Sequence, residues 1–161
     1  MFEEQKAVVK KWLSLNTGND AEIWDAFRAT MSPDLTWTLI GSTPVSGTHR
    51  GLDAVATSFY GKCFSGDGRP GSSQQGLDPV YGVRLNIKEI TALEDGRVMV
   101  HCTSDGRGKN GVPYINEYCW LLEVKDGKIA SMYEFADTAL IERAMFDKKI
   151  VPAEKCPQIP R

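Results

Sequence analysis

The sequence is poor in the residues that bind metals, cross membranes or hold nucleic acid. Only two histidines and four cysteines occur among 161 residues, and no two cysteines form a C-x-x-C pair, which disfavours a zinc site. No apolar run is long enough to span a bilayer. The net charge is −2 and the basic residues are scattered, so nothing favours nucleic-acid binding. We therefore expect no metal, no nucleic-acid partner and no membrane partner.

The composition that remains is typical of a globular protein, with 42% hydrophobic and 25% charged residues. The length suits one domain with its own core, so we expect a single domain over residues 1–161. The first twelve residues are charged and lack the apolar core of a signal peptide. A cytoplasmic location with reduced cysteines is the expectation.

The order of the predicted elements is typical of an α+β fold. Helical spacing of apolar residues predicts helices over 3–15, from 19 or 20 onward, and over 52–64. A strand is predicted over 35–40, then four antiparallel strands between 80 and 137, then a short helix over 138–147. We expect three helices in the N-terminal half to pack on a curved, mostly antiparallel sheet. Residues 65–79, rich in Gly, Ser and Pro, predict a flexible loop, and residues 150–161 an irregular tail.

Two glycine turns give a predicted register for the last three strands. If Asn110-Gly111 and Asp126-Gly127 are two-residue turns, side chains face each other in three rows on one face of the sheet. These rows are Asp105/Asn116/Asp137, Thr103/Tyr118/Phe135 and His101/Trp120/Tyr133. The opposite face then carries Val98, Val100, Cys102, Glu117, Cys119, Leu121, Met132 and Glu134. One β-bulge would shift part of this register.

The first face holds the candidate site. Asp137 is the predicted general base if an apolar pocket raises its pKa, although an Asp at this position also suits the N-cap of the following helix. Asn116 is predicted to orient Asp137 or to donate to a substrate carbonyl. Asp105 and His101 are further acid–base candidates, with turn chemistry or a structural role as alternatives. Six aromatic residues are predicted to bind a small apolar or aromatic ligand: Trp37, Tyr114, Tyr118, Trp120, Tyr133 and Phe135.

The chain resembles the SnoaL-like, ketosteroid-isomerase-related group of the nuclear-transport-factor-2-like superfamily. The similarity rests on Trp37, the P-x-S-G-x-x-R-G run over 44–51, Tyr114-x-Asn116-Glu117-Tyr118, and the segments 126–129 and 134–138. The resemblance implies a cone-shaped α+β fold, a pocket between sheet and helices, and a homodimer packed through the other sheet face. In polyketide cyclases of this type an aspartate near the end of the last strand is the base, and Asp137 matches it.

The reaction stays open at this point. The expectation is cofactor-independent acid–base catalysis, as in an isomerase, cyclase or dehydratase, on a small, largely apolar molecule bearing a carbonyl. A non-catalytic dimeric binding module and a plain interaction domain are the alternatives. An epoxide hydrolase of the limonene type is a further one, with Asp105 and Asp137 as its two acids. That activity would need an Arg where this chain has Thr103.

Overall fold

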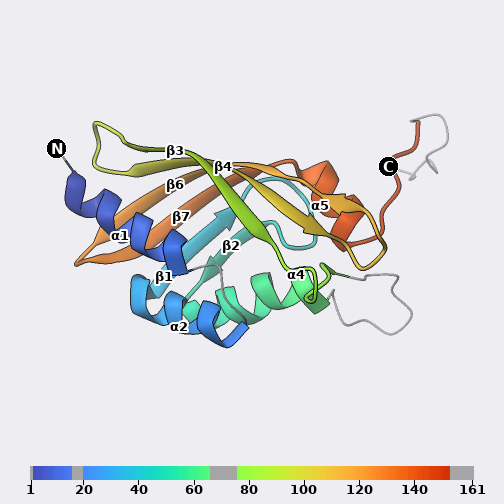
Figure 1. Ribbon diagram of the computed structural model, residues 1–161, viewed down its shortest axis with the longest axis horizontal. Coiled ribbons are helices and arrows are strands. Elements are labelled where there is room, and N and C mark those ends of the chain that lie inside the picture. Colours follow the sequence, from blue (N-terminus) through green and yellow to red (C-terminus); the bar gives the residue numbers. More distant parts are fainter. Residues whose placement is uncertain (1, 16–19, 66–75, 153–161) are drawn as a thin grey trace, which may run out of the picture.

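A long curled sheet lies against a layer of helices (Figure 1). The computed structural model describes residues 2–15, 20–65 and 76–152. The helical segments are α1 (Glu3–Leu15), α2 (Asp20–Thr30), α3 (Leu52–Ala54), the π-helical η1 (Val55–Tyr60), α4 (Gly61–Ser65) and α5 (Thr138–Met145). The strands are β1 (Met31–Leu39), β2 (Gly47–Arg50), β3 (Arg84–Ala92), β4 (Val98–Arg107), β5 (Pro113–Tyr114), β6 (Glu117–Lys125) and β7 (Lys128–Ala136).

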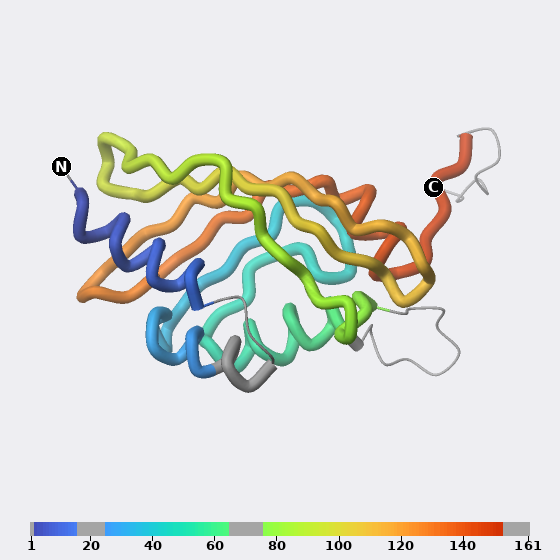
Figure 2. Tube along the Cα trace, viewed as in Figure 1, coloured from blue at the N-terminus to red at the C-terminus, as the bar shows by residue number. Residues whose placement is uncertain are grey.

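The sheet has the order β2-β1-β7-β6-β4-β3, and the short β5 pairs with β4. Every pairing is antiparallel except that of β1 with β7. The tube view shows β3, β4, β6 and β7 running back and forth along the long axis, with α2 and the helical segment 52–65 on one side of them (Figure 2). The predicted α+β fold with a curved, mostly antiparallel sheet is therefore confirmed.

Most predicted elements occur where the sequence placed them. The main differences are β2, where no strand was predicted, and β1, which begins at Met31 instead of residue 35 and so contains Pro33. A register shift against β7 between Met31 and Thr36 leaves Pro33 outside the paired positions. The predicted loop over 65–79 includes residues 66–75, and the predicted tail includes residues 153–161; both ranges lie outside the described residues. In the described part of the chain, no helix has the length and apolar character needed to cross a bilayer.

The turn between β6 and β7 forms as predicted, but a bulge follows it. Asp126 and Gly127 have φ values of 50° and 70°, as a two-residue type I′ turn requires, and Lys125 pairs with Lys128. Val124 then pairs with Ile129, whereas Glu123 pairs with Ser131, so Ala130 is an extra residue. Beyond this bulge every pair is shifted by one residue relative to the prediction.

The connection between β4 and β5 is longer than predicted. The Gly108 N–H donates to the Val112 carbonyl at 2.8 Å, so three residues form the loop instead of two. Gly111, the last of them, has a φ of 83°, which glycine adopts without a Cβ clash. The additional loop residue shifts the pairing of β4 with β6 by one residue, and Cys102 instead of Thr103 faces Tyr118.

These two shifts correct the predicted faces of the sheet. Side chains of β6 point as expected, whereas those of β4 and β7 are reversed, because each was displaced by one residue. The three predicted rows are therefore wrong. The inner face, against the helices, carries Val98, Val100, Cys102, Tyr118, Trp120, Met132 and Glu134. The outer face carries His101, Thr103, Asp105, Glu117, Cys119, Leu121, Tyr133 and Phe135.

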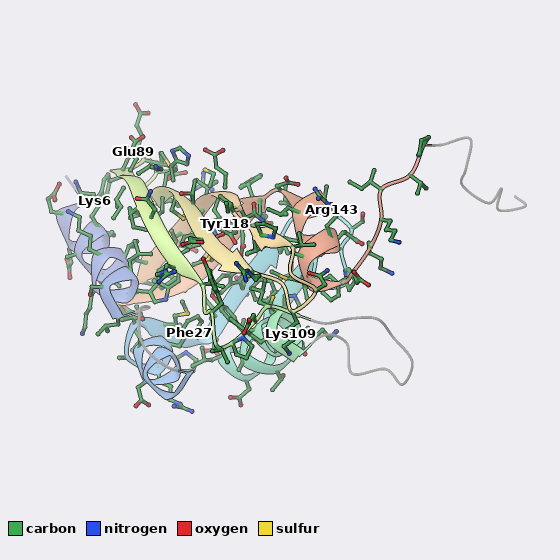
Figure 3. The ribbon with its side chains drawn as sticks, turned by 45° about the vertical axis from the view of Figure 1, so that its right-hand side comes forward. Lys6, Phe27, Glu89, Lys109, Tyr118 and Arg143 are labelled. Atoms are coloured by element: carbon green, nitrogen blue, oxygen red, sulfur yellow. The ribbon has the colours of Figure 1, made fainter. Side chains whose placement is uncertain are left out.

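The core lies between the inner sheet face and the helices, and it is rich in aromatic rings. Trp12 of α1, Phe27 of α2 and Trp37 of β1 are fully buried, and their ring centroids lie 6.1–6.4 Å apart. In Figure 3, Tyr118 lies within the molecule, whereas Lys6 and Glu89 lie at its edge. Burial of large aromatic surfaces supplies much of the hydrophobic stabilisation of a domain this size.

Candidate functional site

One carboxylate is buried in this aromatic core. Glu134 of β7 is only 6% exposed, and its Oε2 accepts a 2.7 Å hydrogen bond from Trp37 Nε1. No Lys, Arg or His in the described part of the chain forms an ion pair with it. An acidic side chain at such a position is uncommon, because burial without a countercharge disfavours the ionised form.

The strand pairing explains how Glu134 enters the core. Alternation along β7 puts it on the same face as the buried Met132, and it lies opposite Trp120 of β6. On the other side β1 runs parallel to β7, with Leu39 beside Glu134 and Trp37 beside Met132. Trp37 is therefore close enough to donate across the strand boundary to the carboxylate.

Burial raises the pKa of Glu134 from 4.5 to about 7. The indole N–H groups of Trp37 and Trp120 act in the opposite direction by favouring the charged form. The Trp120 group does so although its Nε1 forms no hydrogen bond of ordinary geometry within the described residues. A carboxyl group with a pKa near 7 exchanges its proton readily at neutral pH, which is the property of an effective general base.

Tyrosine and cysteine side chains surround the same carboxylate. Burial and then the charge of Glu134 raise the pKa values of Tyr60 and Tyr118 above their ordinary values. The same two causes raise the pKa of Cys63, and that of Cys102 to about 12, so both thiols stay protonated. We call Glu134, Trp37, Tyr60, Tyr118 and Trp120 the Glu134 cluster.

Tyr60 reaches the cluster from the π-helical segment η1. Its ring centroid lies 5.4 Å from that of Trp37 and 5.1 Å from that of Phe27. The neighbouring Phe59 also faces inward, at 5.2 Å from Trp37. The wider turn of a π-helix brings successive aromatic residues toward the core, and such segments occur frequently at functional sites.

A buried polar junction adjoins the cluster. Tyr118 Oη donates to Tyr114 Oη at 2.8 Å, and Asn116 Nδ2 donates to the same oxygen at 3.1 Å. Asn116 Nδ2 also donates to the Asp137 carbonyl, and its Oδ1 accepts from the backbone N–H groups of Glu117 and Asp137. Asn116 thus fixes the start of β6 to the end of β7, and its predicted contact with Asp137 involves the backbone.

The Asp137 side chain does not lie in an apolar pocket. It is exposed, and its Oδ1 accepts a 3.0 Å hydrogen bond from Leu140 N, which makes it the N-cap of α5. The structure therefore shows Asp137 in the N-cap role that the sequence indicated as the alternative to a general base. The environment expected for a general base is found three residues earlier, at Glu134.

Two other acid–base candidates lie on the outer face. Asp105 accepts hydrogen bonds from Tyr81 Oη at 3.1 Å and Arg84 Nη2 at 3.4 Å. His101 Nε2 lies 2.7 Å from Glu117 Oε1. Neither group faces the core, so neither reaches Glu134 or Asn116.

The predicted ligand-binding aromatics divide in the same way. Trp37, Tyr114, Tyr118 and Trp120 are buried in the core, whereas Tyr133 is 49% and Phe135 39% exposed on the outer face. In the described part of the chain the buried rings pack against one another. An open surface hollow of ≈ 530 Å³ lies elsewhere, beside Ser32, Thr36, Glu123 and Ser131.

Glu134, Tyr60 and Cys63 are the site residues that the sequence interpretation missed. A signal for Glu134 was present, because Val98, Val100 and Cys102 form a clear apolar alternation that should mark the core face of β4. Applied to β7, the same apolar alternation places Met132 on the core face, and Glu134, two residues further along, lies on that face too. No sequence signal identified the π-helical segment.

Solved structures share this fold. An NTF2-like protein from Burkholderia xenovorans LB400 superposes with a TM-score of 0.62 at 23% identity, covering 89% of this chain and 96% of its own. A candidate SnoaL-like polyketide cyclase from Jannaschia sp. CCS1 gives a TM-score of 0.66 at 18% identity, covering 91% and 94%. A candidate isomerase from Bacillus subtilis gives 0.63 at 17% identity, covering 89% and 93%. No protein-family model matches the sequence, and neither does any curated protein.

Proposed function

From the nuclear-transport-factor-2-like fold that these structures share with the chain, we propose cofactor-independent acid–base catalysis with Glu134 as the general base. The substrate is a small, largely apolar molecule with an acidic C–H beside a carbonyl. Ionised Glu134 removes that proton, the C–H electron pair becomes a C=C bond, and the π pair of the carbonyl moves onto its oxygen. Where the substrate carries a C=C bond next to the deprotonated carbon, the protonated carboxyl returns the proton to the far carbon of the dienolate, and the carbonyl re-forms. The net reaction is an isomerisation or the proton-transfer step of a cyclisation.

The observation that carries this proposal is the buried carboxylate with a pKa of about 7. A buried group that titrates near neutral pH costs folding free energy, so its presence in the core favours a functional role over a packing role. Comparison with a candidate cyclase and a candidate isomerase of the same fold supports proton-transfer chemistry. Tyr118 and Tyr114, whose hydroxyl groups are hydrogen-bonded to each other, are buried phenols that feel the charge of Glu134.

The filled interior favours one alternative. Aromatic rings occupy the space between the sheet and the helices, as expected for a domain whose main role is interaction with a partner. Epoxide hydrolysis has less support, because Asp105 lies on the outer face and Asp137 caps α5.

Solvent-deuterium exchange tests the proposal without a known substrate. Small cyclic and aromatic ketones are incubated with the protein in D2O, and deuterium uptake beside the carbonyl is followed by NMR. We expect the rate to rise as pH increases through about 7, because the ionised form of Glu134 is the base. Glu134→Gln should lower the rate at least about a hundredfold.

The matched control is Asp137→Asn, which makes the same carboxyl-to-amide change three residues along the chain. It should retain exchange, because the Asp137 side chain contacts only the start of α5. Exchange that depends on Asp137 and not on Glu134 would contradict the assignment of the base.

We also propose a homodimer formed through the outer sheet face. The exposed rings of Tyr133 and Phe135 lie there, beside the half-buried Cys119 and Leu121. Exposed aromatic residues gathered on one sheet face are typical of a protein interface.

A further inference from the structure

Two tryptophan side chains in the core have an N–H group without an acceptor. Nε1 of Trp12 and Nε1 of Trp120 are inaccessible to solvent, and neither has a hydrogen-bond partner in the described part of the chain. Trp12 is 0% and Trp120 4% exposed. A buried donor without a partner costs about 1–3 kcal/mol, so such groups are rare in native cores.

Trp120 lies beside Glu134, and Trp12 packs against Trp120. Trp120 is directly opposite Glu134 on the neighbouring strand, and its N–H lowers the pKa of the carboxyl. The ring centroids of Trp12 and Trp120 are 5.4 Å apart, so the two indoles are in direct contact. The T-shaped ring contacts of Trp12 with Phe27 and Trp37 can supply no more than a weak N–H···π interaction.

Trp37, the other tryptophan of the Glu134 cluster, behaves differently from Trp120. Trp37 Nε1 donates to Glu134 Oε2, so its hydrogen-bonding capacity is used within the protein. Trp37 thus holds the carboxyl by a hydrogen bond, whereas the Nε1 atoms of Trp12 and Trp120 have no such partner in the described part of the chain.

We propose that Trp120, assisted by Trp12, donates hydrogen bonds to the substrate oxygen that becomes negatively charged when Glu134 removes the proton. This inference rests on the proposed function and adds the substrate's recognition: an oxygen acceptor on a planar molecule that stacks among indole rings. In a water-poor core, donors aimed at a developing oxyanion stabilise it more than they would in water. Entry of the ligand requires the rings to part, because they are packed together without it.

A phenolate probe tests the donors separately from the base. 4-Nitrophenolate has a delocalised oxyanion on a planar ring, and the Glu134→Gln protein matches the state in which the base has already taken the proton. In a ¹H–¹⁵N spectrum the four tryptophans each give one indole signal. We expect the Trp120 and Trp12 protons to move downfield on titration, and the Trp37 proton to move less.

Variants in the same Glu134→Gln background measure the contribution to affinity. Trp120→Phe and Trp12→Phe should each weaken binding about tenfold, because each removes one hydrogen bond to a charged oxygen. Trp37→Phe removes an indole N–H from the same cluster and should weaken binding less. The spread of the chemical shifts of the remaining indole signals in the same spectrum shows whether each variant is folded.

Equal affinity in Trp120→Phe and Trp12→Phe would overturn the inference, as would an absence of saturable binding. Either result leaves the role of Glu134 intact if deuterium exchange by the wild-type protein still depends on that residue. Conversely, probe binding with the expected shifts, but no Glu134-dependent exchange, would support the donors and contradict the base.

Discussion

The two faces of the β6–β7 hairpin carry similar residues in opposite environments. Each face has a glutamate and aromatic rings: Glu134 with Tyr118 and Trp120 on the inner face, and Glu117 with Tyr133 and Phe135 on the outer face. Glu117 is exposed and its Oε1 lies 2.7 Å from His101 Nε2, whereas Glu134 is buried and accepts a hydrogen bond from the Trp37 indole. The difference shows that residue type alone does not identify the site. Which face of the strand a residue occupies determines whether its carboxyl group is buried.

The largest expected change in stability is at Asn116, whose neighbour Glu117 on the opposite face serves as the control. Asn116→Ala removes a side chain with four buried hydrogen bonds and leaves two backbone N–H groups unpaired. We expect the free energy of unfolding to fall by about 4 kcal/mol in urea denaturation. Glu117→Ala, the control, should change it by less than about 1 kcal/mol, because its ion pair is exposed. Equal losses of unfolding free energy in the two variants would contradict the difference in burial between Asn116 and Glu117.

The pH dependence of stability should differ between the two glutamates. The native state binds the Glu134 proton more tightly than the unfolded chain does, so its contribution is complete below pH 4.5 and is lost as pH rises to about 7. The total loss is about 3 kcal/mol. Unfolding curves of wild type and Glu134→Gln should therefore diverge over this range, with the variant the more stable above pH 7. Glu117→Gln makes the same carboxyl-to-amide change on the outer face and is the control. A Glu134→Gln curve that runs parallel to the wild-type curve would contradict the burial effect.

A smaller change is expected at the end of the same strand. Asp137→Ala removes the N-cap of α5 and should lower the free energy of unfolding by about 1 kcal/mol. Asp137→Asn should be close to neutral, because asparagine caps helices equally well. Thermal denaturation distinguishes the two, and a loss above about 3 kcal/mol in Asp137→Ala would indicate a buried role that the structure does not have.

The smallest effect on folding should come from the outer aromatic rings. Tyr133→Ser with Phe135→Ser should leave the stability of the monomer nearly unchanged, because both rings are exposed. Light scattering should show a dimer for the wild type and a monomer for the double variant. A wild-type monomer at micromolar concentration, or a dimer that survives the substitutions, would contradict the proposed interface.

Local patterns were enough to predict the fold but not the register. The Asp126-Gly127 turn, the final helix and the order of strands follow from glycine positions and apolar periodicity. The bulge at Ala130 and the third residue of the loop before Val112 have no comparable local signal, because both depend on how the sheet curls around the core.

Each of these irregularities moved one strand by one residue, and together they exchanged the faces of β4 and β7. Asn116, Tyr118 and Trp120 were placed correctly since β6 itself was in phase. Because the bulge in β7 was not predicted, Glu134 was assigned to the outer face, and Tyr133 and Phe135 were assigned to the inner face. Apolar alternation within each strand is here a better guide to the buried face than register counted from turns.

The central claim is that Glu134 is a buried carboxyl group that titrates near neutral pH. Labelling the glutamate side-chain carboxyls with ¹³C and following their chemical shifts against pH measures this directly, and Glu134→Gln assigns the signal. We predict a titration midpoint of about 7 for Glu134. A midpoint near 4.5, the ordinary value for a glutamate, would contradict the account.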